Sequence, residues 1–272
     1  MKIGIFDSGI GGLTVLHECY HLIDGQEYIY YADTDNVPYG RRAPEEINKF
    51  VERAIDFLLG KGAEVVVVAC NTATSVAIAA LRKKHKDVQI LGMEPAVKKA
   101  VEETDRKRIL VAATIVTVRE EKLKNLIQKT DSSHRVDTLA LQELVKFAEE
   151  ENFDGPEVTE YLNDKFSTYV PAKYSAFVLG CTHFNYFKPA FARVFGPQVE
   201  LIDGSEGTIR HLAEVADLPM HAADRAVEMK TADEMLEKYH TEYYASGRNV
   251  EDKKTLLHIL HLHNRLEEVR KL

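Results

Sequence analysis

The sequence has few cysteines and no long apolar run, and each shortage excludes a class of protein. Among 272 residues there are three cysteines, Cys19, Cys70 and Cys181, and this odd number at distant positions does not make a disulfide framework. The apolar runs are too short to span a bilayer. No basic and apolar leader precedes the first expected strand. We therefore expect a cytoplasmic protein without a signal peptide and without a membrane partner.

Positive charge is also scarce. Lysine and arginine number 35 against 43 aspartates and glutamates, which gives a net charge of −8 at pH 7. A nucleic-acid partner would require a basic face, so this balance disfavours one. Hydrophobic residues make up 45% of the chain and charged residues 29%, enough for both a buried core and a hydrated surface. The length allows one large domain or two ordinary domains.

Short apolar runs alternate with amphipathic stretches along most of the chain. Runs of apolar residues predict strands at residues 3–6, 28–32, 65–69, 109–112, 136–139, 176–179 and 199–202. Helical spacing predicts helices at residues 13–22, 45–59, 73–84, 118–128, 143–150, 156–166 and 187–194. Beyond Gly204 the pattern is helical to the end.

Strand–helix alternation predicts an α/β fold in which helices cover parallel sheets. The number of strands favours two similar parallel-sheet α/β domains facing each other across a cleft. We expect residues 1–96 plus 208–272 to form the first domain and residues 97–207 to form the second, with the crossing near residues 93–97. In this arrangement the C-terminal helices return to cover the first domain.

The first unusual segment follows the first expected strand, where the ligands of parallel sheets collect. Residues 7–12 read DSGIGG, and the glycines expose backbone amides that suit an anion such as a carboxylate. Dinucleotide binding is the rival interpretation, although the spacing is not G-x-G-x-x-G and no Walker A sequence occurs. The alternative role for Asp7 is to cap the next helix.

Cysteines stand at two further strand ends. Cys70 lies where the strand at 65–69 opens into a helix, and the helix dipole at such a position favours a lowered thiol pKa. Cys181 follows the strand at 176–179 in the same manner, and His183 is a natural proton partner for its thiol. Each cysteine alone is typical of a buried structural residue, but the repeated pattern favours function. We interpret Cys19 as core packing.

Two thiols in two half-sites suit racemisation, which removes a Cα proton from one face and returns a proton to the other. Two bases facing each other across a cleft, one a thiolate and the other a thiol, meet this requirement. A redox dithiol is an alternative, although such centres usually have C-x-x-C spacing, which is absent. Zinc would require more closely arranged ligands than Cys70, Cys181 and His183.

A second group of possible metal ligands lies near the C-terminus. His258, His261 and His263 occur together on a charged helical segment. Metal binding there is one interpretation, and a solvated helical face is the one we favour. We therefore expect no metal site.

The strand-end motifs together resemble those of the glutamate racemases of the aspartate/glutamate racemase superfamily. Residues 7–15 (DSGIGGLTV) are very close to the N-terminal motif of that family, and residues 33–34 with 37–40 (DT and VPYG) look like its second motif. Residues 70–72 (CNT) and 180–183 (GCTH) match its two cysteine motifs in order and spacing. The resemblance runs from Lys2 to about Ser205, and the tail beyond it departs from the family.

This resemblance implies a cofactor-independent interconversion of L- and D-glutamate, which in a bacterium supplies D-glutamate for peptidoglycan. Cys70 would act on D-glutamate with assistance from Asp7. Cys181 would act on L-glutamate with assistance from His183. The resemblance also implies a homodimer, which is the usual oligomeric state in the family.

The family pattern assigns one further acid and the groups that hold the substrate. Glu149 falls near the position of the acid, with Glu150 as the alternative, because the Cys-Pro that precedes this helix in the family is Leu141-Gln142 here. The carboxylates and amine of the substrate would be held by Ser8, Pro38, Tyr39, Gly40, Asn71, Thr72, Thr114, Thr117 and Thr182.

The choice of glutamate depends on one position. The sister aspartate racemases tend to carry Glu where His183 stands, which favours glutamate. Racemisation of another amino acid such as aspartate is the first alternative. Non-catalytic binding of an anion or a nucleotide at the glycine-rich turn is the second.

Overall fold

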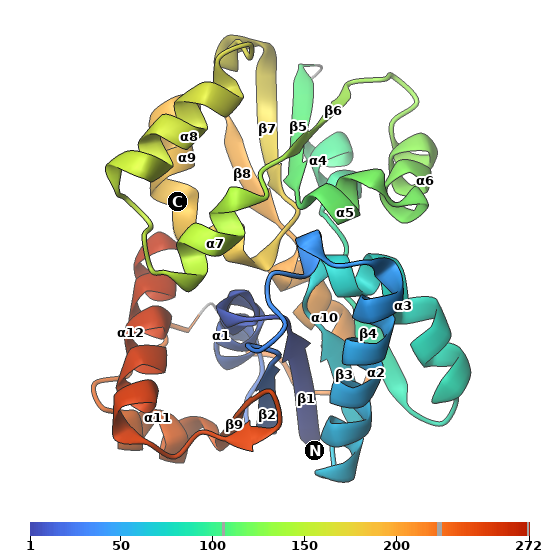
Figure 1. Ribbon diagram of the computed structural model, residues 1–272, viewed down its shortest axis with the longest axis vertical. Coiled ribbons are helices and arrows are strands. Elements are labelled where there is room, and N and C mark those ends of the chain that lie inside the picture. Colours follow the sequence, from blue (N-terminus) through green and yellow to red (C-terminus); the bar gives the residue numbers. More distant parts are fainter. Residues whose placement is uncertain (105–106, 222–224, 271) are drawn as a thin grey trace.

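The computed structural model describes residues 1–104, 107–221, 225–270 and 272. Within these residues the strands form two sheets (Figure 1). The first sheet has the order β10-β9-β2-β1-β3-β4 and consists of β1 (Lys2–Asp7), β2 (Glu27–Ala32), β3 (Val65–Val68), β4 (Gln89–Gly92), β9 (Thr241–Ala245) and β10 (Arg248–Asn249). The second has the order β6-β5-β7-β8 and consists of β5 (Arg108–Ala113), β6 (Val136–Ala140), β7 (Tyr174–Leu179) and β8 (Glu200–Asp203).

Helices cover both sheets. They are α1 (Leu13–Leu22), α2 (Pro44–Gly60), α3 (Asn71–Lys84), α4 (Val97–Glu103), α5 (Ile115–Arg119), α6 (Glu121–Thr130), α7 (Glu143–Glu149), α8 (Pro156–Phe166), α9 (Lys188–Phe195), α10 (Ser205–Val215), α11 (Ala232–Tyr239) and α12 (Lys253–Val269). Short 3-10 helices join some of them: η1 (Ile10–Gly12), η2 (Tyr39–Arg41), η3 (Pro171–Lys173) and η4 (Thr182–Phe187). Among the described residues, no helix has the length and apolar character to cross a membrane.

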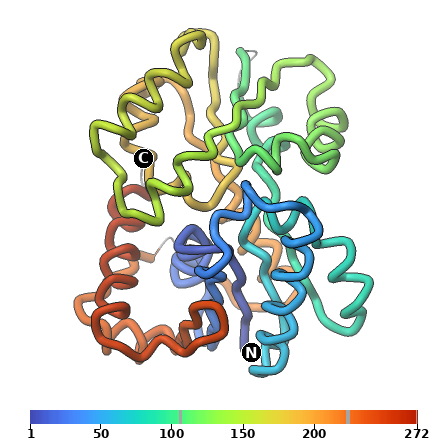
Figure 2. Tube along the Cα trace, viewed as in Figure 1, coloured from blue at the N-terminus to red at the C-terminus, as the bar shows by residue number. Residues whose placement is uncertain are grey.

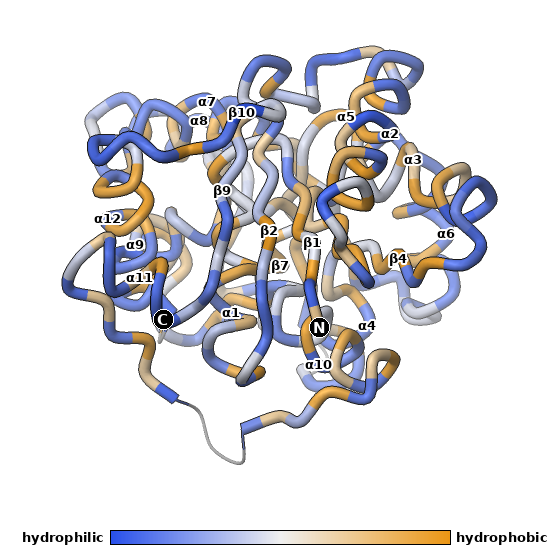
Figure 3. The backbone as a smooth tube through the Cα atoms, turned by 90° about the horizontal axis from the view of Figure 1, so that it is seen from below, coloured by the Kyte–Doolittle hydropathy of each residue, from blue (hydrophilic) through white to orange (hydrophobic). Residues whose placement is uncertain are grey.

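The sheets follow the apolar pattern closely. In the first sheet β1 lies between β2 and β3 in parallel register, with Ile5 opposite Tyr30 on one side and Val67 on the other. The four valines of β3 are all buried, as expected for a parallel strand covered on both faces. Figure 3 shows these central strands in white to orange, while the hydrophilic blue gathers on the peripheral helices and loops. The predicted α/β fold with two parallel-sheet halves is confirmed.

The chain crosses between the halves twice, and the crossings lie side by side. The first crossing joins β4 to α4, and the second joins β8 to α10. A Cβ placed on Gly204 in the second crossing would lie 2.7 Å from the carbonyl oxygen of Glu94 in the first. Only glycine allows so close an approach of the two backbones.

The C-terminal segment differs from its prediction. The expectation of purely helical structure beyond Gly204 was wrong, because β9 enters the first sheet beside β2, with Tyr243 opposite Tyr30. After β9 and β10 the chain forms α12, which packs on α1 of the first half and on η4 of the second. Figure 2 shows this tail running back beside the N-terminal helix.

Several element boundaries also differ. Strand β4 was not predicted, and the helix expected at 118–128 is divided into α5 and α6. Helix α3 begins at Asn71, directly after Cys70, and α7 ends at Glu149. Cys19 is fully buried in the core, which confirms the packing role expected for it.

Candidate active site

Cys70 occupies the N-cap of α3, directly after β3. Its Sγ accepts a hydrogen bond from the amide of Ala73 at 3.4 Å, and its thiol lies 3.7 Å from Ser8 Oγ. Burial raises the pKa of the Cys70 thiol, and the nearby Asp7 raises it further, whereas the Ala73 amide lowers it by less. The expectation of a lowered pKa was therefore wrong, because desolvation exceeds the effect of the helix terminus. Cys70 is a protonated thiol at neutral pH.

Asp7 ends β1 and lies fully buried between the two halves. Its Oδ1 accepts from the amide of Gly9 at 3.1 Å, and its Oδ2 accepts from the hydroxyl of Thr182 at 3.1 Å. Burial raises the pKa of Asp7 to about 6, although the charge of His183 and these hydrogen bonds act in the opposite direction. A carboxyl that titrates near neutrality can accept a proton and release it again.

Cys181 lies beyond the end of β7, and η4 follows it. Its Sγ is 3.8 Å from Nδ1 of His183, whose Nε2 lies 2.6 Å from Oε1 of Glu149. Burial opposes the charging of His183, but the hydrogen bonds to Cys181 and Glu149 outweigh burial and raise its pKa well above the ordinary value. The imidazolium that results would stabilise a thiolate at Cys181.

Glu149 also connects the second half to the glycine-rich turn of the first. The same Oε1 that meets His183 accepts a hydrogen bond from the amide of Ile10 at 2.9 Å. Glu150, the alternative from the sequence, points to solvent and pairs with Lys146 at 3.7 Å. The geometry therefore favours Glu149 as the acid beside His183.

A cluster of threonine hydroxyls spans the two halves. Thr72 Oγ1 lies 2.9 Å from Thr114 Oγ1 and 3.3 Å from Thr117 Oγ1, and the last two are 3.0 Å apart. Thr72 belongs to α3, and Thr114 is the N-cap of α5. The backbone of Gly40 approaches so closely that a Cβ there would lie 2.8 Å from Cβ of Thr114. Small hydroxyls beside free backbone can hold carboxylates without an arginine.

Asn71 has the clearest sign of a missing partner. It is 3% exposed, and among the residues that the structure describes neither its Oδ1 nor its Nδ2 has a hydrogen-bond partner. Buried amide groups are nearly always satisfied, so an orphaned one next to Cys70 indicates a ligand that binds there.

Three further predicted residues are Pro38, Tyr39 and Ser8. Pro38 precedes η2 as its N-cap, and the Tyr39 hydroxyl donates to Oδ2 of Asp33 at 2.6 Å, so Tyr39 would meet a ligand through its backbone. Ser8 Oγ lies 3.4 Å from Oδ1 of Asp7. Ser8 therefore lies beside both Asp7 and Cys70.

Hydrogen bonds hold the two half-sites together. The bonds from Thr182 to Asp7 and from Ile10 to Glu149 cross between the halves, and so does the contact of Thr72 with Thr114. The sulfurs of Cys70 and Cys181 are close enough that a charge on Cys181 would raise the pKa of Cys70. Each of these cysteines is 6% exposed. The two thiols thus lie near each other and almost out of contact with solvent.

Comparison with known proteins identifies the family. Residues 13–212 match the family described as Asp/Glu/Hydantoin racemase. The protein belongs to this family.

The chain is similar to named relatives over nearly its whole length. A glutamate racemase from Lachnospira eligens is 47% identical over 278 residues, covering 100% of both chains. The crystal structure of a glutamate racemase from Campylobacter jejuni has a TM-score of 0.77 at 31% identity and covers 97% of this chain and 98% of that one. An Escherichia coli glutamate racemase, solved with L-glutamate and the activator UDP-MurNAc-ala, has a TM-score of 0.75 at 27% identity and covers 92% and 99%.

Sequence reasoning missed three residues of this racemase-family site. Gln142 is buried, its Oε1 accepts from the amide of Ile115 at 3.3 Å, and its Nε2 has no partner. The hydroxyls of Tyr30 and Tyr186 donate to backbone oxygens of the glycine-rich turn, at Gly9 (2.6 Å) and Ile10 (3.2 Å). The position of Gln142 just after β6 was an available signal, because other strand ends carry the site. For Tyr30 and Tyr186 the sequence offered no signal beyond the apolar residues around them.

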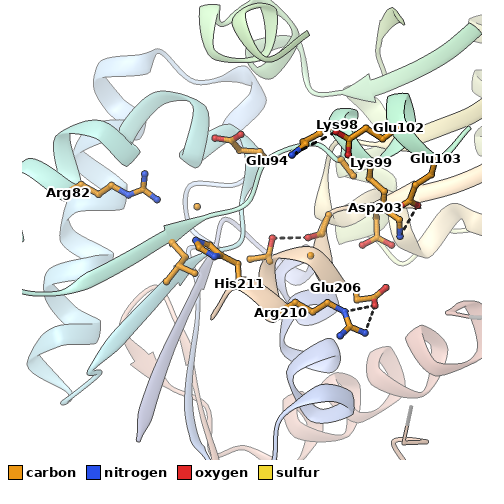
Figure 4. Close-up of a pocket in the computed structure, with 16 residues that line it drawn as sticks. Arg82, Glu94, Lys98, Lys99, Glu102, Glu103, Asp203, Glu206, Arg210 and His211 are labelled. Atoms are coloured by element: carbon orange, nitrogen blue, oxygen red, sulfur yellow. Dashed lines mark hydrogen bonds and ion pairs between the residues drawn. The ribbon is translucent and has the colours of Figure 1, made fainter. Parts of the chain in front are cut away.

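A separate hollow lies beside the two crossings. It has a volume of about 700 Å³ and is lined by charged side chains of both signs (Figure 4). Arg210 pairs with Glu206 at 2.8 Å, whereas Arg82 donates to the backbone carbonyl oxygen of Ile90 at 2.8 Å. Neither cysteine of the two half-sites lines this hollow. The two half-sites therefore remain the candidate active site of this racemase-family protein.

The C-terminal histidines divide into two kinds. His261 is exposed, and His258 is partly exposed and pairs with Glu151 at 3.2 Å. His263 is fully buried, with Nδ1 3.1 Å from Nδ1 of His17. The expectation of a solvated face was therefore wrong for His263, because α12 turns it inward against α1.

Proposed function

We propose that this protein interconverts L- and D-glutamate by two-base proton transfer between Cys181 and Cys70. The observation that carries the proposal is the pair of neighbouring thiols, one from each half, each beside its own proton-handling group. His183 and Glu149 adjoin Cys181, while Asp7 adjoins Cys70. Such an arrangement places a base and an acid on opposite faces of one carbon.

In the direction from L-glutamate, Cys181 acts as the base. The His183 imidazolium stabilises the Cys181 thiolate, which removes the Cα proton and becomes a thiol. Cys70, whose thiol pKa is raised, donates its proton to the opposite face of the planar intermediate. When product leaves, Cys181 releases the proton that it took from Cα and the Cys70 thiolate is reprotonated, so both residues return to their starting states. One proton is removed and one is returned, so no cofactor takes part in the balance.

In the direction from D-glutamate the roles are exchanged. Cys70 must first become a thiolate, and Asp7, with a pKa of about 6, is placed to take the thiol proton. Cys181 then supplies the proton on the opposite face, and His183 supports it. The different partners of the two thiols explain why each would serve one enantiomer.

The substrate carboxylates and amine would be held by the polar groups around the thiols. Asn71 and Gln142 provide unsatisfied amide groups. The cluster of Thr72, Thr114 and Thr117 provides hydroxyls. Backbone amides at the starts of α3 and α5 offer further donors for a carboxylate. Charge that develops on the carboxylate next to the carbanion would be stabilised by these fixed dipoles.

Substrate entry requires the halves to separate. Cys70 and Cys181 are each 6% exposed, and Glu149 ties the second half to the amide of Ile10. Opening about the paired crossings would break these bonds, and closing over glutamate would exclude water.

Glutamate is favoured over aspartate by the names of similar proteins and by His183. The Lachnospira eligens relative is named a glutamate racemase, and the Escherichia coli structure was solved with L-glutamate. We further propose that the protein acts in the cytoplasm as a homodimer and supplies D-glutamate for peptidoglycan.

The decisive experiment is incubation with L-glutamate in deuterated water without added cofactor. We expect deuterium at Cα and a racemic product, measured by NMR and chiral chromatography. Cys70→Ser and Cys181→Ser should each lower racemisation by about 10²- to 10⁴-fold, since each removes one acid–base group. Cys19→Ala, which alters a core cysteine, is the matched control and should retain activity. Exchange of aspartate but not glutamate would overturn the substrate, and undiminished activity of either serine variant would overturn the mechanism.

A further inference from the structure

Two histidines and a glutamate meet on the side of α1 that faces α12. His17 and His21 are four residues apart on α1, so both side chains lie on one face of the helix. Oε2 of Glu267, from α12, lies 3.1 Å from Nε2 of His17 and 2.8 Å from Nε2 of His21. The three ligand atoms lie within 4.8 Å of one another. The mechanism above uses none of these residues.

The surroundings of His21 fix the direction of its lone pair. Its Nδ1 lies against the backbone carbonyl oxygen of Arg225. A carbonyl oxygen only accepts hydrogen bonds, so Nδ1 carries the hydrogen and Nε2 faces the Glu267 carboxylate. Nε2 of His21 and Oε2 of Glu267, 2.8 Å apart, are close enough to bind one metal ion together. An N–H donated to a backbone carbonyl is the usual support of a metal-bound histidine.

His17 has a similar support on its inner side. Its Nδ1 lies 3.1 Å from Nδ1 of the fully buried His263, whose Nε2 is 3.4 Å from the hydroxyl of Tyr243. In the tautomer in which His17 donates to His263, Nε2 of His17 is free to bind a metal ion. This contact orients the ring toward Glu267.

A neighbouring positive charge is already paired. The nearby cation Arg270 is paired with Glu18 at 3.1 Å, which reduces its repulsion of a dication.

We propose that His17, His21 and Glu267 form a binding site for a divalent transition-metal ion, with Zn²⁺ as the best fit. Two imidazole nitrogens and one carboxylate oxygen are a ligand set that zinc takes with a water in its fourth position. The ion reaches the site past Glu267, whose side chain is 23% exposed.

Such an ion would fasten the C-terminal helix to the first half. Helix α1 follows the glycine-rich turn that carries Asp7, and α12 is reached only after β9 has joined the first sheet. The ion would therefore stabilise the fold, and it has no step in proton transfer.

The test uses the full-length protein after removal of metal with EDTA. Calorimetric titration with ZnCl₂ should give about one ion per chain, and Zn²⁺ should raise Tm in a manner that EDTA reverses. His21→Gln and Glu267→Gln should each weaken Zn²⁺ binding at least about tenfold. His258→Gln, which alters another α12 histidine beside a carboxylate, should bind as the parent does.

Co²⁺ distinguishes this site from the thiols. Visible absorption of a nitrogen–oxygen site, without the near-ultraviolet band of Co²⁺–thiolate bonds, is the expected spectrum, and racemase activity should persist with one Zn²⁺ bound. Circular dichroism checks that both glutamine variants are folded. Absence of stoichiometric binding to the parent protein, binding unaffected in both variants, or a thiolate spectrum would each overturn the proposal.

Discussion

Asp7 is a buried carboxyl whose ionisation costs folding energy. The pKa of Asp7 is raised from 3.8 to about 6, so the folded chain binds this proton more tightly than the unfolded chain does. The contribution of Asp7 to the free energy of unfolding is therefore favourable at low pH and is lost as the pH rises through about 6. The cost of the ionised form is about 3 kcal/mol.

Asp7→Asn should raise stability and lower activity together. Above pH 7 the variant should gain up to about 3 kcal/mol in the free energy of unfolding, and below pH 4 less than about 1 kcal/mol. Racemisation from D-glutamate should fall by about 10²-fold or more, because Cys70 loses its base. Urea unfolding at pH 4 and pH 8 and chiral assays in both directions measure these changes. A variant that is less stable at pH 8 than the parent would contradict the electrostatic argument.

Glu149 contacts His183 and Glu150 does not, and mutation can test this difference. Glu149→Gln removes the negative charge beside His183, which should lower the pKa of His183 and reduce kcat for L-glutamate by about tenfold or more. Glu150→Gln is the matched control and should leave kcat unchanged, because its carboxylate faces solvent beside Lys146. The pH profile of kcat with L-glutamate should shift only in the first variant. Equal losses in both variants would contradict the assignment.

Single residues were predictable where a strand end repeated a pattern. Cys70 and Cys181 each follow a buried strand, and the parallel sheets bring such positions to one edge. His263 could not be found in this way, because its importance depends on which residue faces it across the molecule, whereas the position of Gln142 just after β6 was a usable signal. The pKa of Cys70 was also out of reach, since the depth of its burial depends on how the folded chain packs around it.

At the level of elements, the turn η1 fits against η4 with no space to spare. A Cβ on Gly11 would overlap the side chains of Thr182 and His183. The glycines of this turn thus allow the two half-sites to close, in addition to exposing their amides.

Gly11→Ala should hold the halves apart. We expect kcat to fall by about 10²-fold, because misplacement by about 1 Å is enough to disturb proton transfer. Gly207→Ala in α10 is the control, since nothing lies within 4 Å of its added Cβ. Steady-state kinetics of the two variants measures the difference, and an unimpaired Gly11→Ala enzyme would contradict the closed geometry.

Uniform burial made β3 easier to predict than β9. The valines of β3 are buried on both faces and were predicted, whereas β9 contains the exposed Glu242 and lies between helical segments, which hid it. The tyrosines of β9 favour a strand, but this segment becomes a strand because it pairs with β2.

For the whole molecule, the tail is part of the first sheet. We propose the division into residues 1–96 with 208–272 and residues 97–207. In this division β9, Tyr243 and Leu262 belong to the core of the first domain, where Tyr243 and Leu262 are 2% and 0% exposed.

Removal of residues 231–272 should therefore abolish cooperative unfolding. The truncated chain would expose the α1 surface that Tyr20 and His17 form against the tail. Thermal denaturation followed by circular dichroism should show a broad transition, and gel filtration should show aggregation. A sharp transition near that of the full chain would mean that the tail is a dispensable addition.

The position of β9 also sets an order on synthesis. The sheet of residues 108–203 is complete once those residues have left the ribosome, whereas the N-terminal sheet lacks a strand until residue 245 has emerged. The half that is translated first is thus finished last, and chains interrupted late would carry one assembled sheet and one with an open edge.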